Sequence, residues 1–211
     1  MSRVLARLRS WLTIDEGPSL ESVRHRFVAI DLETTGLDPR RDAIVSLAAI
    51  PFLDGVPTAG YVTLVNPGRP IPPESTAVHG LTDGMVRGAP PLEHVLRDAE
   101  PVIESAVLVG HNVGFDVAVL SRARRARGLP RVRNHVIDTN RLAASLHPEW
   151  RDLSLEHVAD RLGVEVVARH TAEGDALTAG RILVALLPEL GARRVRTVGE
   201  LLWWERRARS R

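Results

Sequence analysis

The chain has 211 residues, a hydrophobic content of 44% and a net charge of +2, which suits one globular domain with short extensions. It contains no cysteine, which excludes a disulfide framework and thiolate metal sites, and no apolar run reaches the roughly 18 residues of a membrane span. The N-terminus lacks the apolar core and cleavage site of a secretory signal, so a cytoplasmic location is expected.

The first half of the chain predicts a three-stranded antiparallel meander. Its strands are expected at residues 27–32, 43–52 and 60–65, with turns at 36–42 and 54–57. The second half alternates helical patterns with two short strands. Helices are expected at residues 91–105, 115–127 and 171–187, and a further helix is expected to be capped by Ser154 and to end at Gly163. Strands are expected at 106–109 and 136–138. This order predicts an α/β protein whose mixed central sheet combines the meander with two further strands and is flanked by helices.

Acidic side chains stand where these elements end or begin. Asp31 and Glu33 close the first strand, and because they are two residues apart they share one face of it. Asp116 closes G-H-N-V-G-F-D, just after the strand at 106–109. His170 and Asp175 belong to H-T-A-E-G-D, with the histidine in a loop and the aspartate one turn into the last helix. Such a set could hold metal ions.

Carboxylates in this pattern suit the hydrolysis of a phosphodiester. The diester is anionic and repels a hydroxide nucleophile, so positive charge is needed at both the attacking and the leaving oxygen. Two divalent cations about 3.5 to 4 Å apart supply that charge. Mg²⁺ prefers oxygen ligands and keeps several waters, so a few carboxylates are enough. We therefore expect two divalent cations, Mg²⁺ or Mn²⁺.

Three motifs, D-x-E-T-T-G, H-N-x-x-F-D and H-x-x-x-x-D, occur in this order and together resemble the DnaQ-like, DEDDh exonuclease family. The resemblance covers roughly residues 26 to 187 and implies a ribonuclease-H-like fold. The segment S-T-A-V-H-G-L-T-D-G-M-V-R-G-A-P is similar to the DNA polymerase III epsilon and PolC-type branch.

The resemblance also implies a role for each residue. Asp31 would bridge both metals, Glu33 and Asp175 would hold the metal at the attacking water, and Asp116 would help to hold the second metal. His170 would be the general base, since an imidazole titrates near working pH. Another branch of the family uses a tyrosine there, but the only tyrosine of this chain falls in the expected third strand.

Substrate contacts are expected around this set. The loop after the first strand would receive the 3′-terminal nucleotide through Thr34, Thr35, Gly36 and Leu37, where glycine allows close approach of backbone. His111 and Asn112 could reach the terminal sugar or a phosphate, although Asn112 could equally cap the following helix. His79 could line the nucleotide pocket or be a structural turn residue.

Three further acids compete for a role in the site. Asp138 also ends an apolar strand, and we interpret it as the cap of a helix that starts near Asn140. Asp38 and Asp42 flank a turn, so we expect them to be solvated.

All 28 basic residues are arginines. Six of them cluster after the Asp116 segment, namely Arg122, Arg124, Arg125, Arg127, Arg131 and Arg133. They could follow a phosphate backbone or simply solvate a helix face and its exit loop.

Three regions are expected: an N-terminal amphipathic helix and linker at 1–25, an exonuclease domain at 26–190 and a basic helical extension at 191–211. The apolar positions of residues 1–12 have helical spacing, and we expect this segment to pack on its own domain or on the L-L-W-W sequence near residues 201–204. Docking on a partner or a membrane surface is the alternative. A polymerase partner is possible, but the chain has no glutamine for a clamp-binding motif.

The sequence thus predicts a metal-dependent 3′-to-5′ exonuclease that releases nucleoside 5′-monophosphates from single-stranded or frayed DNA, in proofreading or repair. Three alternatives remain open. They are an exoribonuclease of the ribonuclease T or oligoribonuclease type, a non-catalytic module that binds nucleic acid or a polymerase, and a peripheral membrane or scaffold protein.

Overall fold

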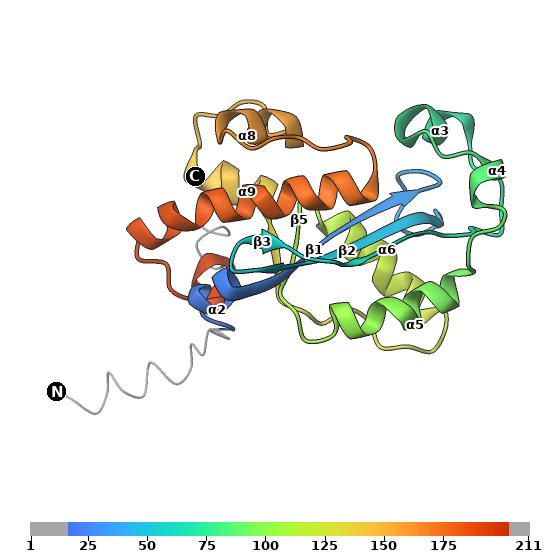
Figure 1. Ribbon diagram of the computed structural model, residues 1–211, viewed down its shortest axis with the longest axis horizontal. Helices are drawn as coiled ribbons and strands as arrows, with labels where there is room; N and C mark the ends of the chain where they lie inside the picture. Colours follow the sequence, from blue (N-terminus) through green and yellow to red (C-terminus); the bar gives the residue numbers. More distant parts are fainter. Residues whose placement is uncertain (1–16, 203–211) are drawn as a thin grey trace.

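The computed structural model describes residues 17–202, which form a mixed sheet with helices on both faces (Figure 1). The strands are β1 (Arg26–Thr34), β2 (Ile44–Leu53), β3 (Val56–Pro57), β4 (Tyr61–Leu64), β5 (Leu108–Gly110) and β6 (Val136–Asp138). Their order is β3-β2-β1-β5-β6, and β4 also pairs with β2. Pairing is antiparallel between β1 and β2 and parallel from β1 through β5 to β6. The predicted mixed α/β sheet is confirmed.

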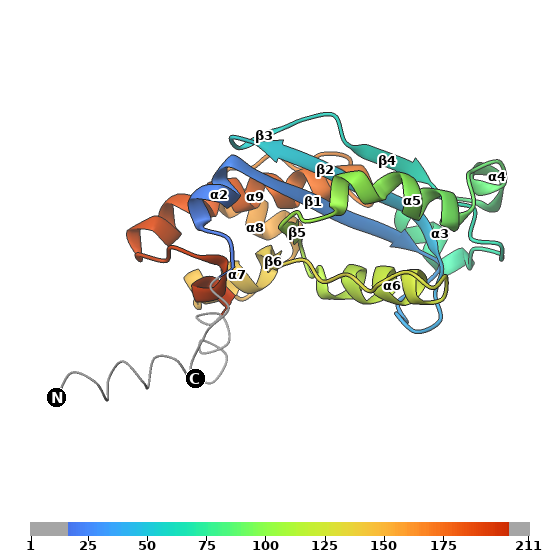
Figure 2. The ribbon, with the colours of Figure 1, turned by 90° about the horizontal axis from the view of Figure 1, so that it is seen from below.

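Eight helices of the described range are α2 (Leu20–His25), α3 (Pro73–His79), α4 (Asp83–Val86), α5 (Leu92–Ile103), α6 (Gly114–Arg125), α7 (Thr139–Leu146), α8 (Leu155–Arg161) and α9 (Ala172–Ala192). The long helix α9 crosses one face of the sheet, with α7 and α8 on the same side, while α5 and α6 cover the opposite face (Figures 1 and 2).

The alternation of side chains along β1 builds two cores. Phe27 and Ala29 pack toward α9, where the rings of Phe27 and Phe52 stack with centroids 4.7 Å apart. Val28 and Ile30 pack toward α5 and α6. Because the period of a strand is two, Asp31 and Glu33 emerge on the α9 face. This register decides which helix can meet the two carboxylates.

Two parts of the element prediction were wrong, and the short helices α2, α3 and α4 were not predicted. Residues 54–57 were expected to be only a turn, but the chain reverses at Asp54 and Gly55, which have φ of 49° and 79°, and returns as β3. The last helix was expected to end at residue 187, before Pro188. Instead α9 continues to Ala192, because Leu190 beyond the proline is fully buried in the core.

Both ends of the described chain pack together. The Leu20 amide donates to the Arg196 carbonyl at 2.7 Å, and the Val198 amide donates to the Pro18 carbonyl at 3.0 Å. Leu201 is fully buried in the same core as α9. The predicted amphipathic segment 1–12 and the two tryptophans of L-L-W-W lie outside the described residues. Within residues 17–202, no helix has the length and apolar character to cross a membrane.

Candidate active site

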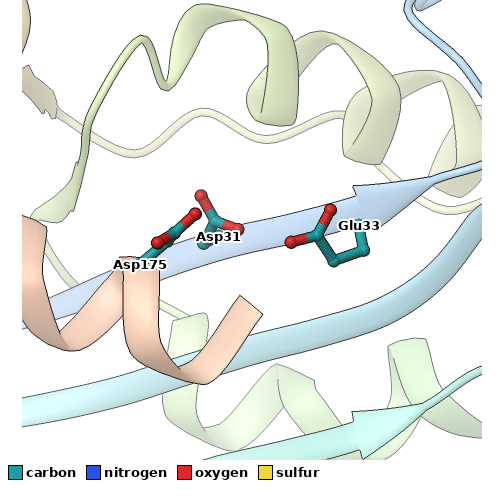
Figure 3. Close-up of side chains that lie close together, drawn as sticks. All are labelled: Asp31, Glu33 and Asp175. Atoms are coloured by element: carbon teal, nitrogen blue, oxygen red, sulfur yellow. The ribbon is translucent and has the colours of Figure 1, made fainter. Parts of the chain in front are cut away.

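Three carboxylates converge where the end of β1 meets the start of α9. Asp31 and Glu33 project from the same face of β1, and Asp175 projects from the first turn of α9 toward them (Figure 3). One ligand oxygen from each residue lies within 4.8 Å of the other two. Residues separated by about 140 positions in the chain therefore form one acidic cluster.

Asp116 approaches β1 from the opposite helical layer. It is a buried residue in the first turn of α6, and its Oδ1 accepts the Leu32 amide at 3.0 Å. Leu32 stands between Asp31 and Glu33, so this bond ties α6 to the strand at the acidic cluster. After burial, the charge of Asp116 is the largest influence on the Asp31 carboxyl. The four predicted acids are therefore brought together.

The electrostatics of the cluster favour added positive charge. Desolvation, followed by the charge of Asp175, raises the pKa of Glu33 to about 7. Desolvation also raises the pKa of Asp116 to about 7, against hydrogen bonds from its own and the Leu32 amides. Burial and the neighbouring acids raise the pKa of Asp31 well above its ordinary value. Desolvation and mutual repulsion thus disfavour the charged form of each carboxylate, and a cation between them would stabilise it.

The side chain of Asp175 shows whether the acidic cluster suits a cation. Its Oδ1 is buried and has no hydrogen-bond partner among the described residues, although a buried carboxylate oxygen normally has one. Its Oδ2 is in contact with Nη1 of Arg169, and Arg169 also donates through Nε to Glu156 at 2.5 Å. Burial raises the pKa of Asp175, and the Arg169 charge opposes this. An unpartnered oxygen within an all-carboxylate set suits a hard divalent cation.

His170 lies at the entrance to α9. Its backbone is left-handed, with φ of 62°, and its Nδ1 is 3.3 Å from Nη1 of Arg169. The next residue, Thr171, caps α9 by accepting the Gly174 amide at 3.0 Å. A Cβ on Gly174 would lie 2.1 Å from the Val167 carbonyl oxygen, so only glycine lets the preceding loop pack this closely against the helix. His170 is held in this way one turn before Asp175.

The loop after β1 is built around Asp42. Its Oδ1 accepts the Thr35 hydroxyl at 3.1 Å and its Oδ2 accepts the Asp38 amide at 2.8 Å. A Cβ on Gly36 would lie 2.6 Å from the same carboxylate. The expectation that Asp42 is merely solvated was therefore wrong. The loop presents Leu37, whose side chain is 90% exposed, beyond the end of β1.

Arg122 fastens this loop from α6. Its Nε donates to the Pro39 carbonyl at 2.8 Å, and its Nη2 donates to the Asp42 carbonyl. Arg122 was singled out in the sequence only as part of a basic cluster. Its structural role could not be seen there because its partners are about 80 residues away.

The two histidines predicted to contact substrate, His111 and His79, differ in whether their ring nitrogens are already hydrogen-bonded. His111 has both ring nitrogens engaged, with Thr139 Oγ1 at 2.9 Å and the Leu153 carbonyl at 2.8 Å, so neither nitrogen is free for a ligand. His79 is buried at the end of α3, its Nδ1 accepts the Leu81 amide at 3.0 Å, and its Nε2 has no partner in the described chain. Burial lowers the pKa of His79, against a smaller effect of the Thr34 carbonyl.

The proposed helix caps can be compared directly with the structure. Asp138 caps α7 by accepting the Asn140 amide at 3.1 Å, as predicted. Its Oδ1 also accepts the Asn112 amide at 3.0 Å. Asn112 has a left-handed φ of 60° and makes no side-chain cap to α6, so that alternative was wrong and its side chain is exposed. Ser154 does precede α8, but its hydroxyl bonds His157 instead of a helix amide.

The family model for exonucleases named RNase_T matches residues 28–183, which contain all four acids and His170. This chain belongs to that exonuclease family. The membership confirms the resemblance to DnaQ-like exonucleases that the motifs indicated.

Curated relatives of this exonuclease domain carry replication names. A DNA polymerase III subunit epsilon-like protein of Rhodobacter capsulatus is 44% identical over 181 residues, which are 83% of this chain and 26% of that protein. A DNA polymerase III PolC-type of Streptococcus suis is 35% identical over 163 residues, which are 77% of this chain and 11% of that protein. The chain thus spans about a quarter or less of the length of these relatives.

Solved exonucleases share the fold. Exonuclease X, solved in complex with 5′ overhanging duplex DNA, is 28% identical with a TM-score of 0.63, and the match covers 79% of this chain and 92% of that one. Exonuclease I of E. coli, solved with a dT13 oligonucleotide, gives a TM-score of 0.69 at 19% identity, covering 80% of this chain and 42% of that one. The second likeness concerns the fold alone.

Arg169 and Glu156 are site residues of this exonuclease domain that the sequence analysis missed. Arg169 joins the acidic cluster to α8 through its ion pairs with Asp175 and Glu156. The position of Arg169 directly before His170 was a local signal. Nothing in the sequence indicated Glu156, because it reads as an ordinary first-turn acid of α8.

Proposed function

We propose that this domain is a metal-dependent 3′-to-5′ exonuclease that hydrolyses the last phosphodiester of single-stranded or frayed DNA and releases nucleoside 5′-monophosphates. The observation that carries the proposal is the convergence of Asp31, Glu33 and Asp175, with one oxygen from each within 4.8 Å of the others, beside buried Asp116. The match to the exonuclease family model over residues 28–183 supports it. We assign this catalytic unit to residues 26–190, flanked by regions at 1–25 and 191–211.

Four carboxylates would hold two divalent cations, Mg²⁺ or Mn²⁺. Asp31 is central because Asp116, Asp175 and Glu33 all act on its carboxyl, so we assign it to both ions. Glu33 and Asp175 would share the first ion with it, and Asp116 would serve the second. Bound there, the cations would supply positive charge at the attacking and the leaving oxygen.

His170 is the proposed general base. It stands one turn before Asp175, in a backbone conformation fixed by the Thr171 cap and the close packing of Gly174. It would accept a proton from the attacking water as the oxygen of that water bonds to the phosphorus. The leaving group is the 3′ oxygen of the penultimate nucleotide.

The loop after β1 would receive the terminal nucleotide. Thr34 and Thr35 lead into Gly36, where backbone can approach a ligand, and exposed Leu37 offers an apolar surface to a base. Asn112 has an exposed side chain at the start of α6 and could contact sugar or phosphate. His79, near the Thr34 carbonyl, would line the far side of this pocket, whereas the bonded His111 would position neighbouring loops.

The test is digestion of a 5′-labelled single-stranded DNA, with an RNA of the same sequence alongside, in Mg²⁺, Mn²⁺ or EDTA. We expect a ladder that shortens from the 3′ end with either metal and none with EDTA. Asp116→Asn should abolish it. The matched control is Asp138→Asn, because asparagine also caps helices and this acid lies outside the proposed ligand set.

Two outcomes would change the assignment. A ladder on the RNA strand alone would make the domain an exoribonuclease. Tight binding of single strands without metal-dependent products would indicate a non-catalytic nucleic-acid or polymerase-binding module.

A further inference from the structure

A groove runs along the exposed side of α6. It has a volume of about 580 Å³ and lies between α6 and the segment at 131–133 that leads into β6. The course of α6 and of the chain that leads into β6 can be followed in Figure 2. Gly114, Ala118 and Ser121 lie on this side of the helix at spacings of four and three residues, so they share one face. Their small side chains leave room for a ligand to approach the helix.

The lining is positively charged. Arg122, Arg125, Arg131 and Arg133 line the groove, and no acidic residue does. Arg122 is engaged by the carbonyls of Pro39 and Asp42, whereas the other three are exposed and form no ion pair within residues 17–202. A helix face that is only solvated usually carries both signs of charge. Three unpaired guanidinium groups around one groove create a positive potential that attracts an anion.

The groove lies on the face of α6 that points away from the acidic cluster. Gly114 lines it, whereas Asp116, two residues later on the first turn, faces β1 on the opposite side of the helix. A strand that extends from the cluster into the groove would pass around the start of α6. From Asp116 to Arg125 the helix rises about 13 Å, at about 1.5 Å per residue. Phosphates of one strand of a duplex repeat about every 3.4 Å along the axis, so this length corresponds to roughly four nucleotides.

We propose that this groove binds the phosphates of the nucleic-acid strand upstream of its 3′ end, through Arg125, Arg131 and Arg133. The proposal rests on the proposed exonuclease function and extends it to the length of substrate that the domain grips. Guanidinium groups suit this ligand because they bind phosphate oxygens in a bidentate manner and stay charged at all working pH values.

The experiment compares fluorescein-labelled dT16 and dT4 by fluorescence anisotropy in EDTA, at 50 and 200 mM salt. Each arginine that contacts a phosphate of a single strand adds about 0.7 to the slope of log affinity against log salt. The triple variant Arg125→Ala, Arg131→Ala, Arg133→Ala should therefore lose about two units of that slope for dT16. Over this salt range the wild-type affinity should fall about 20-fold more than that of the variant.

Two controls separate the groove from general charge effects. Arg97→Ala removes an exposed arginine of α5 outside the groove. It should change the slope by no more than about 0.7, which is the contribution of one arginine. The triple Arg→Lys variant should keep most of the slope, because lysine retains the charge. Binding of dT4, whose few phosphates must already span the way from the acidic cluster around the start of α6, should change less than binding of dT16 in every variant.

The proposal is overturned if the triple alanine variant binds dT16 with the wild-type affinity and slope, or if Arg97→Ala has an equal effect. Hydrolysis of both oligonucleotides in Mg²⁺ is measured in parallel. Absence of hydrolysis by the wild type would contradict the proposed function, whereas unchanged binding by a fully active triple variant would contradict the groove alone.

Discussion

At the scale of single residues, the fold holds the carboxylates of the acidic cluster close together against desolvation and charge repulsion. Desolvation and neighbouring acids raise the pKa of Glu33 and Asp116 to about 7 each. Such shifts gather where a protein binds a cation or performs proton chemistry. They also make the metal-free protein sensitive to pH.

We expect the metal-free protein to lose stability as pH rises. Because the folded pKa of Glu33 and Asp116 lies above the ordinary value, the native state binds more protons than the unfolded state between about pH 4 and pH 7, and the free energy of unfolding falls across that window. Thermal unfolding in EDTA should give a lower Tm at pH 8 than at pH 5, and saturating Mg²⁺ should reduce the difference. Asp31→Asn should also reduce it. A Tm in EDTA that rises from pH 5 to pH 8 would contradict this view of the cluster.

The second residue-scale prediction concerns the base. His170→Ala should lower kcat by about two to four orders of magnitude, as expected for loss of general-base catalysis, with little change in KM. His157→Ala, which changes an exposed histidine of α8, is the control and should keep the wild-type kcat. Nearly full activity of His170→Ala between pH 6 and pH 8 would mean that another group accepts the proton.

At the scale of elements, the loop after β1 is held from two sides. Asp42 organises it from within, and Arg122 of α6 fixes the carbonyls of Pro39 and Asp42. Since α6 also carries Asp116, one helix positions both an acid of the cluster and the loop that presents Leu37. The geometry of the loop and of the acidic cluster is thereby coupled.

We expect Arg122→Met to loosen this loop. Loss of charged hydrogen bonds worth about 1.5 kcal/mol or more should raise KM for dT4 about tenfold and leave kcat nearly unchanged. Trypsin should cleave the variant faster after Arg40 and Arg41, which are exposed in the loop. Arg127→Met is the matched control, because Arg127 donates only to Ala123 in its own helical turn. Equal tryptic rates for wild type and Arg122→Met would contradict a fastening role.

The elements themselves could largely be predicted from local pattern. Apolar runs bounded by turn residues predicted β1 and β2, the spacing of two placed Asp31 and Glu33 on one face, and the short strand at 136–138 was predicted with its observed bounds. The strand at β3 and the continuation of α9 past Pro188 could not be predicted locally, because pairing with β2 and burial of Leu190 stabilise them. Gly174 is a similar case, since its need for close packing appears only when the loop at 167–168 meets α9.

At the scale of the whole molecule, the sheet assembles the site from distant segments. Parallel pairing of β1, β5 and β6 brings the start of α6 beside the end of β1, and α9 returns across the opposite face to add Asp175. The motifs identified the four acids and His170, but the sequence could not place Arg169 against Asp175 or Arg122 against the loop. Those contacts exist only in the folded arrangement of α6, α8 and α9.

The central claim is that the acids of β1, α6 and α9 together form a binding site for two divalent cations. Calorimetric titration of Mn²⁺ into the full-length protein with thymidine 5′-monophosphate present tests it most directly, with Asp31→Asn beside the wild type. We predict two Mn²⁺ per wild-type chain and at most one, weakly bound, in the variant, because Asp31 is proposed to serve both ions. Wild-type protein that binds no Mn²⁺ at millimolar concentration, or an Asp31→Asn variant with unchanged stoichiometry and affinity, would contradict the account.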